Sequence, residues 1–106
     1  MSTEEQQSPI AATKNGLVLG REKSGVLLFN GIPYAEPPVG DLRFKRPVSP
    51  ASWDNVRDST KFGPAAPQLP SGGMTDSAPV NWSEDCLFLN ICTPGIDKKK
   101  RPVLVW

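Results

Sequence analysis

Proline limits the structures that this chain can form more than any other residue type. Between Pro33 and Pro70 a proline falls every few residues, and each one fixes φ and lacks a backbone N–H. Neither a helix nor a central strand can run through such a segment. The sequence therefore predicts a long, ordered surface excursion, and we expect Phe44, Trp53 and Phe62 to pin it to a core.

Two short apolar runs precede the excursion. Gly16–Gly20 and Val26–Phe29 are separated by the charged residues 21–25, a pattern typical of an antiparallel hairpin. Gly20 and Gly25 have the spacing of the two glycines in a phosphate loop. The Lys-Ser/Thr pair that should follow the second glycine is missing, so a strand-connecting turn is favoured. We expect residues 1–12 to be a flexible tail and residues 13–106 to carry the fold.

The second half of the chain resumes strand-like patterns. Cys86-Leu87-Phe88-Leu89-Asn90-Ile91-Cys92 contains one strongly polar side chain, so we expect a strand covered on both faces, as in a sheet between helices. Residues 68–78 predict a flexible loop, and residues 98–101 a basic turn in solvent. Residues 103–106 begin a wholly apolar strand, yet the chain offers no helix to cover either strand. This pattern indicates an incomplete fold.

Charge and cysteine content exclude several classes of function. The net charge is +1, so no overall field attracts nucleic acid or an anionic membrane. If Cys86 and Cys92 share one strand, they lie about 20 Å apart, too far for a disulfide. The chain has no histidine, which leaves too few soft ligands for zinc. We expect no metal, no cofactor and, in the absence of a secretory signal, a cytoplasmic protein.

No catalytic group of a nucleophilic hydrolase is visible. Such an enzyme needs a base, most often histidine, and a serine on a strained turn such as Gly-x-Ser-x-Gly, and neither occurs. The sequences Pro64-Ala-Ala-Pro67 and Pro67-Gln-Leu-Pro70 have the spacing of polyproline ligands, so a proline-rich interaction segment remains an alternative to an enzyme.

Two long motifs nevertheless carry a resemblance. The segments FNGIPYAEPPVGDLRFKRP (residues 29–47) and SEDCLFLNICTP (residues 83–94) closely resemble the two amino-terminal signatures of type-B carboxylesterases, a branch of the α/β-hydrolases. The resemblance extends over residues 13–106. The signature positions in the second motif are Glu84, Asp85, Cys86, Leu87, Leu89, Asn90 and Pro94.

The resemblance implies an α/β fold, present here as the amino-terminal portion of an α/β-hydrolase and incomplete on its own. Its expected parts are a starting antiparallel hairpin, long proline-rich loops and the first strands of the central mixed sheet. In the family, the oxyanion-hole loop and the Ser, acid and His of the triad follow the segment that resembles residues 102–106. The whole enzyme is expected to hydrolyse small carboxylic esters, and this chain alone to be inactive. A decayed gene without catalysis is a further alternative.

The family also implies a structural ion pair between Arg43 and Glu84. If that pair is buried, loss of Arg43 should cost about 3–5 kcal/mol. Secreted members join the cysteine that corresponds to Cys86 to one in the preceding loop, where this chain has Ala66. A reducing compartment is therefore expected. Cys92 stands where the family commonly has an aromatic residue, and we expect it to be a small core filler.

Overall fold

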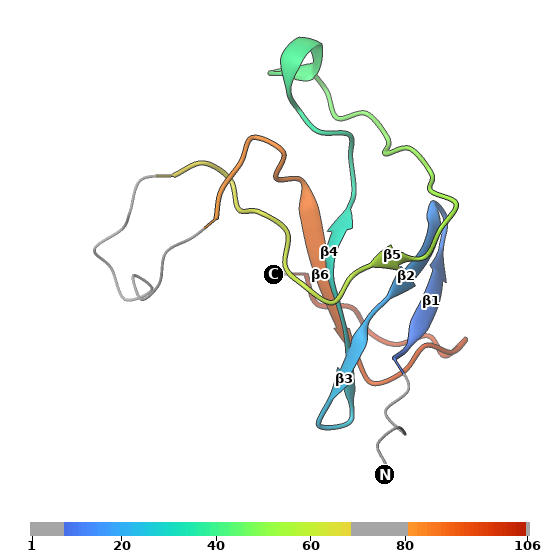
Figure 1. The fold of residues 1–106 in the computed structure, drawn as a ribbon. Helices are drawn as coiled ribbons and strands as arrows, with labels where there is room; N and C mark the ends of the chain where they lie inside the picture. The colour runs from blue at the N-terminus through green and yellow to red at the C-terminus, as the bar shows by residue number, and fades with distance from the viewer. Residues whose placement is uncertain (1–7, 69–80, 106) are drawn as a thin grey trace.

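The computed structural model describes residues 8–68 and 81–105. Within these residues the regular structure consists of six strands and one short 3-10 helix, η1 (Gly40–Leu42), with no α-helix. The strands are β1 (Ile10–Thr13), β2 (Gly16–Leu19), β3 (Arg21–Lys23), β4 (Val26–Pro33), β5 (Arg57–Asp58) and β6 (Phe88–Thr93). They form two three-stranded sheets, ordered β1-β2-β5 and β3-β4-β6 (Figure 1).

The first two strands form a hairpin that the sequence reasoning missed. β1 pairs antiparallel with β2 through a two-residue turn, from Ile10 opposite Leu19 to Thr13 opposite Gly16. The predicted tail over residues 1–12 is therefore wrong from Ile10 onward. The two turn residues are Lys14 and Asn15, and asparagine is common in turns, but no strand pattern was recognised before them.

The predicted hairpin forms between different strands from those expected. Val26–Phe29 does not pair with Gly16–Gly20; β4 pairs instead with β3, which is formed by the charged residues expected to be the turn. The turn itself is Ser24-Gly25, and both residues have positive φ, 54° and 82°. That combination matches the right-handed twist of paired strands. The predicted strand-connecting turn is therefore confirmed, in preference to a phosphate loop.

The proline-rich excursion is confirmed in its main feature. Within its described part, η1 and the two-residue β5 are the regular elements between the end of β4 and Gln68, and Figure 1 shows the segment passing over η1 and back toward β2. Trp53 pins it as predicted, because its indole N–H donates to the Leu17 carbonyl at 2.8 Å and its amide donates to the Asn15 carbonyl.

The two phenylalanines do not pin the excursion. Phe44 is 93% exposed and Phe62 is 72% exposed. Near Phe62 the main chain makes the close approach instead, since a Cβ on Gly31 would lie 2.8 Å from the Lys61 carbonyl oxygen. The prediction failed because backbone contacts, which side-chain type does not reveal, hold this part of the segment.

The hydrophobic core lies between the two hairpins. Val18, Phe29 and Ile32 form its buried centre, and Ala11, Leu27 and Trp53 pack against them. Val18 comes from β2 and Phe29 from β4, so the core joins the two sheets. It is small for a chain of this length, which leaves the outer parts of both sheets to solvent.

The second half of the chain departs from the predicted coverage. The strand begins at Phe88, so Cys86 lies before it. Leu89 and Ile91 are 38% and 43% exposed, and Cys92 is exposed rather than a core filler. The prediction of two covered faces failed because the described residues contain no α-helix that could pack on the faces of β6.

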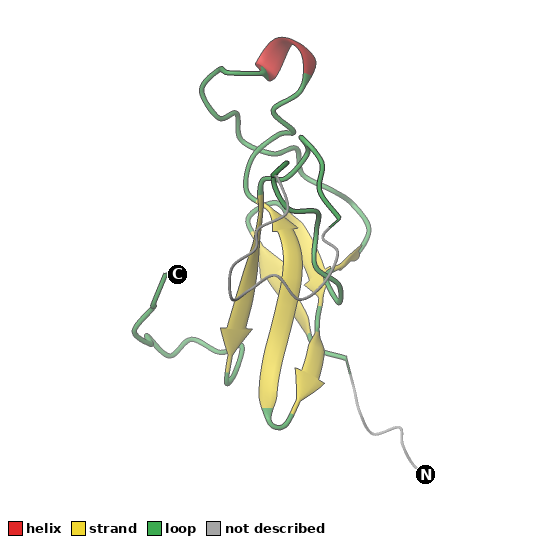
Figure 2. Cartoon of the chain, turned by 90° about the vertical axis from the view of Figure 1, so that its left-hand side faces the viewer, coloured by secondary structure: helices red, strands yellow, loops and turns green. Residues whose placement is uncertain are grey.

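The apolar segment after β6 is not a strand where the structure describes it. Residues 102–105 have no regular secondary structure and no strand partner among the described residues, and a strand needs a neighbour to satisfy its backbone groups. Figure 2 draws this segment as loop, apart from the strands. Trp106 and most of the predicted loop over residues 68–78 lie outside the described residues.

Candidate functional site

The two signature motifs lie side by side in the β4–β6 ladder. Phe29 pairs with Ile91, Ile32 with Leu89, and Pro33 with Phe88. Beyond the strand end, the Tyr34 amide continues the contact by donating to the Leu87 carbonyl at 3.1 Å. Segments more than fifty residues apart in sequence thus form one structural unit, which is the candidate site.

A β-bulge at Gly31 interrupts this ladder and gives Asn90 its role. The register shifts between Phe29 and Ile32, and Gly31 has φ of 68°, which glycine tolerates best. The Gly31 amide then donates to the Asn90 side-chain oxygen at 3.0 Å. Asn90 therefore satisfies a backbone donor that the irregular ladder leaves unpaired.

Arg57 supports the bulge from β5 and was not predicted. One of its guanidinium nitrogens lies 3.5 Å from the Gly31 carbonyl oxygen. The guanidinium also lies 5.5 Å from the ring centre of Trp53 and 6.0 Å from that of Phe88, within the range of cation–π attraction. Its Nε is buried without a hydrogen-bond partner among the described residues. No sequence pattern pointed to this arginine.

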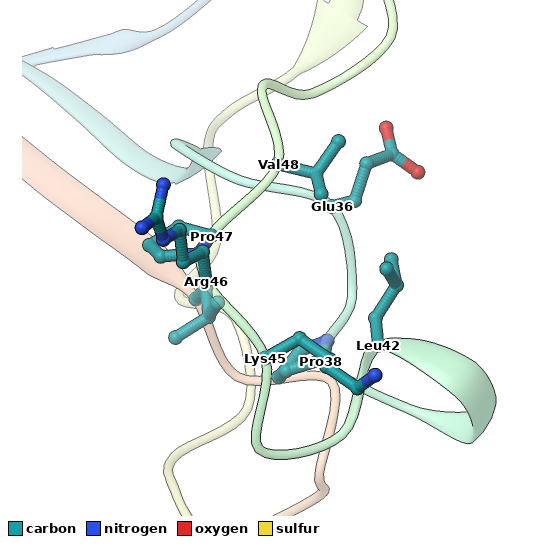
Figure 3. Close-up of a pocket in the computed structure, with 8 residues that line it drawn as sticks. Glu36, Pro38, Leu42, Lys45, Arg46, Pro47 and Val48 are labelled. Atoms are coloured by element: carbon teal, nitrogen blue, oxygen red, sulfur yellow. The ribbon is translucent and has the colours of Figure 1, made fainter.

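Residues 36–48 form a closed surface loop that contains a small hollow. The Glu36 amide donates to the Val48 carbonyl at 2.8 Å, so the ends of the loop meet, as in an Ω-loop. Figure 3 shows the lining residues arranged around the opening. The cavity measures about 60 Å³, far below the roughly 300 Å³ of a small-molecule site. It is too small for an ester substrate.

Arg43 and Glu84 lie within ion-pair distance across the two motifs. Arg43 Nε is 3.5 Å from Glu84 Oε1, and the two side chains are 57% and 48% exposed. The guanidinium also lies 5.2 Å from the ring centre of Phe44. Because solvent screens such a pair, it should contribute about 0–1 kcal/mol. The burial on which the larger value of 3–5 kcal/mol depended is absent here.

The other signature residues show contacts and burial that suit a structural role. The Asp85 amide donates to Ser83 Oγ at 3.1 Å, and Cys86 and Leu87 are half-buried. Leu89 and Pro94 are exposed. None of these contacts arranges a nucleophile beside a base, so the motif holds the chain in position.

The basic turn after β6 is held by one of its own residues. Arg101 donates to both carboxylate oxygens of Asp97, at 2.5 and 2.9 Å. These hydrogen bonds, together with one from the Lys99 amide, lower the pKa of Asp97 to about 2. Of the four cations in residues 98–101, Arg101 is neutralised within the turn.

The described residues lack the groups needed for metal or triad chemistry. They contain no cluster of three or more His, Cys, Asp or Glu side chains that could hold a metal ion. The whole chain has no histidine, so its own residues cannot supply the usual base for a serine nucleophile. The candidate site is therefore a structural unit without its own reaction centre.

Over residues 8–68 and 81–105, no helix has the length and apolar character that a membrane span requires.

Comparison with known proteins gives consistent matches. The sequence profile described as the carboxylesterase family matches residues 7–106. The chain is 48% identical over 103 residues to phenmedipham hydrolase of Pseudarthrobacter oxydans, covering 92% of this chain and 21% of that protein. It is 42% identical over 99 residues to para-nitrobenzyl esterase of Bacillus subtilis, covering 92% of this chain and 20% of that protein.

Solved structures agree with the sequence matches. The carboxylesterase Est55 of Geobacillus stearothermophilus has a TM-score of 0.76 and 42% identity, over 88% of this chain and 18% of that chain. A para-nitrobenzyl esterase structure has the same TM-score over 84% of this chain and 19% of that chain. The chain spans about a fifth of the length of the relatives it matches. These neighbours confirm the expected fold class, of which this chain shows the strand-rich part.

Proposed function

Because the chain belongs to the carboxylesterase family, we propose that it forms the amino-terminal part of an enzyme that hydrolyses carboxylic esters. One observation carries this proposal: the match spans residues 7–106 of this chain but only about a fifth of each relative. The substrates would be small esters, since the relatives include a para-nitrobenzyl esterase.

The reaction in the whole enzyme would follow the serine-hydrolase scheme. A serine attacks the ester carbonyl to form an acyl-enzyme, a histidine acts as base, backbone amides stabilise the oxyanion, and water releases the acid. This chain has no histidine, so by itself it should be inactive. Its contribution would be to begin the sheet on which those groups are mounted.

The β4–β6 unit is suited to that supporting role. The bulge at Gly31 is satisfied on one side by Asn90 and approached on the other by Arg57, so three segments meet at one point. The loop over residues 36–48 follows β4 closely and is closed on itself by the hydrogen bond from the Glu36 amide to the Val48 carbonyl. We expect a unit with these contacts to position the remaining strands of the enzyme's sheet.

The interaction-segment alternative is not favoured. Ala65 forms a parallel bridge with Trp82: its amide donates to the Asn81 carbonyl, and its carbonyl accepts from the Ser83 amide. A polyproline ligand must present its backbone and rings to a groove, whereas the backbone of Ala65, inside the first of the two motifs, is already paired with residues 81–83. The end of the second motif, at Pro70, lies outside the described residues. The other alternative, a decayed gene without catalysis, is tested by the experiment that follows.

A chimera tests the proposed function. The matching fifth of Bacillus subtilis para-nitrobenzyl esterase would be replaced by this 106-residue chain, and hydrolysis of a para-nitrobenzyl ester would be measured. We expect a folded chimera to hydrolyse the ester, with a variant that lacks the esterase's own nucleophilic serine as the inactive control. A folded chimera that has no activity would contradict the proposal.

We propose a cytoplasmic location for the whole protein. Cys86 and Cys92 are both free, and Ala66 occupies the position where secreted relatives are expected to have a partner cysteine. The proposal is supported if a thiol-specific alkylating reagent labels both cysteines in unreduced cell extract. Recovery of a Cys86 disulfide from the same extract would contradict it.

A further inference from the structure

Two polar atoms at the end of the excursion nearest the bulge are buried without a hydrogen-bond partner. They are Arg57 Nε and Ser59 Oγ, and no donor or acceptor among the described residues reaches either of them. Ser59 is 0% exposed, so its hydroxyl does not reach bulk water. Because the large majority of buried side-chain polar atoms in proteins have a partner, two such atoms so close in sequence point to a common cause.

The backbone holds both residues in place. Arg57 pairs with Val18 in the β2–β5 ladder. The Ser59 amide donates to the Leu19 carbonyl at 2.7 Å, and the Ser59 carbonyl accepts from the Asn30 amide at 2.8 Å. Ser59 is thus tied to β2 on one side and to β4 on the other, and a backbone shift that exposed its hydroxyl would break these hydrogen bonds.

The two side chains lie on the same face of the chain. Side chains two residues apart in an extended segment point to one face, and Asp58 between them is exposed. The Cα atoms of Arg57 and Ser59 are therefore about 6.6 Å apart, which is two steps of roughly 3.3 Å. One water molecule with two hydrogen bonds of about 2.9 Å spans most of such a gap.

The guanidinium of Arg57 is held beside an acceptor. It lies 5.5 Å from the ring centre of Trp53 and 6.0 Å from that of Phe88, so an aromatic ring on each of two segments restricts its position. Its Nη2, on the same edge of the planar group as Nε, is 3.5 Å from the Gly31 carbonyl oxygen. That distance is long for a hydrogen bond, so the carbonyl can accept a second one.

We propose that Arg57 Nε, Ser59 Oγ and the Gly31 carbonyl oxygen bind one buried water molecule. The water accepts from Nε, donates to the carbonyl and forms a third hydrogen bond with the Ser59 hydroxyl. Three hydrogen bonds are typical for a buried water, and these three join β5 to the bulge in β4. A halide ion would also accept from both side chains, but the carbonyl oxygen would repel it, so water is favoured.

A crystal structure of the folded chimera tests the site directly. At a resolution that shows ordered waters, we expect one density peak within about 3.2 Å of both Arg57 Nε and Ser59 Oγ. Crystals grown in sodium bromide distinguish the occupants, because bromide gives an anomalous signal and water gives none. A bromide signal, the lack of a peak, or a Ser59 hydroxyl that donates directly to a protein carbonyl would each overturn the inference.

Substitution of Ser59 gives opposite signs in the two cases. If the water is bound, Ser59→Ala removes one of its hydrogen bonds and should lower the urea midpoint of the chain. If the hydroxyl has no partner, the same change removes an unsatisfied polar group from the core and should raise the midpoint. Ser52→Ala is the control, because Ser52 is exposed and its midpoint should not change. A midpoint for Ser59→Ala that is raised or unchanged contradicts the proposal.

Arg57→Lys makes the test specific to the bridge, because it removes Nε and keeps the positive charge. In that background the bridge is already lost, so Ser59→Ala should no longer lower the midpoint. An equal loss in both backgrounds would show that the Ser59 hydroxyl acts without Arg57. Neither measurement depends on ester hydrolysis, so the water site and the proposed function can each fail while the other stands.

Discussion

Trp53 and the Val103–Val105 segment are both strongly apolar, yet they have opposite surroundings. Trp53 packs on the core of Val18, Phe29 and Ile32 and donates a hydrogen bond from its indole to β2. Residues 103–105 are more than four fifths exposed and have no strand partner among the described residues. The end of the molecule around Trp53 is closed by its own residues, whereas the described residues leave the end around β6 open.

The difference shows where this chain gains its stability. Around Trp53, the two strands of a short hairpin and the returning excursion bury apolar surface against one another. Around β6, hydrogen bonds satisfy one side of the strand and leave the other to solvent. Substitutions at the first end should therefore change the stability of the chain more than substitutions at the second.

The largest effect is expected for Phe29→Ala. Phe29 is 2% exposed in the core, and such a truncation costs about 3–5 kcal/mol of unfolding free energy, measured by urea unfolding of the chain at low protein concentration. Phe44→Ala is the matched control, because Phe44 is 93% exposed and should change stability by no more than about 0.5 kcal/mol. Similar losses for both variants would break the distinction between the closed and the open parts.

Gly31→Ala is the next most disruptive change. Gly31 has φ of 68°, which costs a residue with a Cβ about 1–2 kcal/mol, and the new atom would also lie 2.8 Å from the Lys61 carbonyl oxygen. Gly40→Ala isolates the first effect, since Gly40 has φ of 61° and a Cβ added there would meet no atom within 4 Å. We expect the larger drop in the urea midpoint for Gly31, and an equal drop would show that the backbone near Lys61 can move aside.

Arg43→Ala tests the link between the proline-rich excursion and the open end. Because the pair with Glu84 is about half exposed, we expect a loss of about 0–1 kcal/mol that diminishes further in high salt. A double-mutant cycle with Glu84→Gln, followed by urea unfolding, isolates the coupling energy. A coupling of several kcal/mol would mean that the pair is desolvated and that the two regions are tightly joined.

The smallest effect concerns pH and Asp97, in the turn after β6. Its pKa is lowered from the ordinary value of 3.8 to about 2 by hydrogen bonds from Arg101 and the Lys99 amide. Since the folded pKa is the lower one, the contribution to stability is present above about pH 4 and is lost as the pH falls through about 2. An NMR titration of the Asp97 carboxyl should have its midpoint near 2, and Arg101→Gln should raise it. A midpoint at 3.8 in the unsubstituted chain would show that Arg101 does not contact the Asp97 carboxylate in solution.

Sequence reasoning succeeded where one residue type imposes a local constraint. The prolines predicted the lack of long regular elements between β4 and Gln68, because each ring restricts its own backbone. A strand-connecting turn was predicted over residues 21–25 from the charged run between two apolar runs, and the structure places it at Ser24-Gly25, where glycine permits positive φ. The prediction assigned the wrong partner strands because pairing depends on which segments meet in space.

The candidate site was less predictable. The two signature motifs were identified from the sequence, but the contact of Asn90 with Gly31 requires the bulge that brings them together. Arg57 was missed because its neighbours Trp53, Phe88 and Gly31 come from three separate segments. Phe44 and Phe62 were misjudged because hydrophobicity predicts a preference for burial and cannot say whether a surface is present to provide it.

The amino-acid sequence by itself determined the family, the proline-restricted course of residues 33–68 and the lack of a histidine base. These properties follow from residue identity and local backbone geometry. The tertiary structure alone decided the strand partners, the bulge that Asn90 satisfies, the half-exposed setting of Arg43 and Glu84, and the open edge of β6. Pairing and burial are properties of surfaces in contact, and those contacts form only when distant segments of the chain, or a partner, come together.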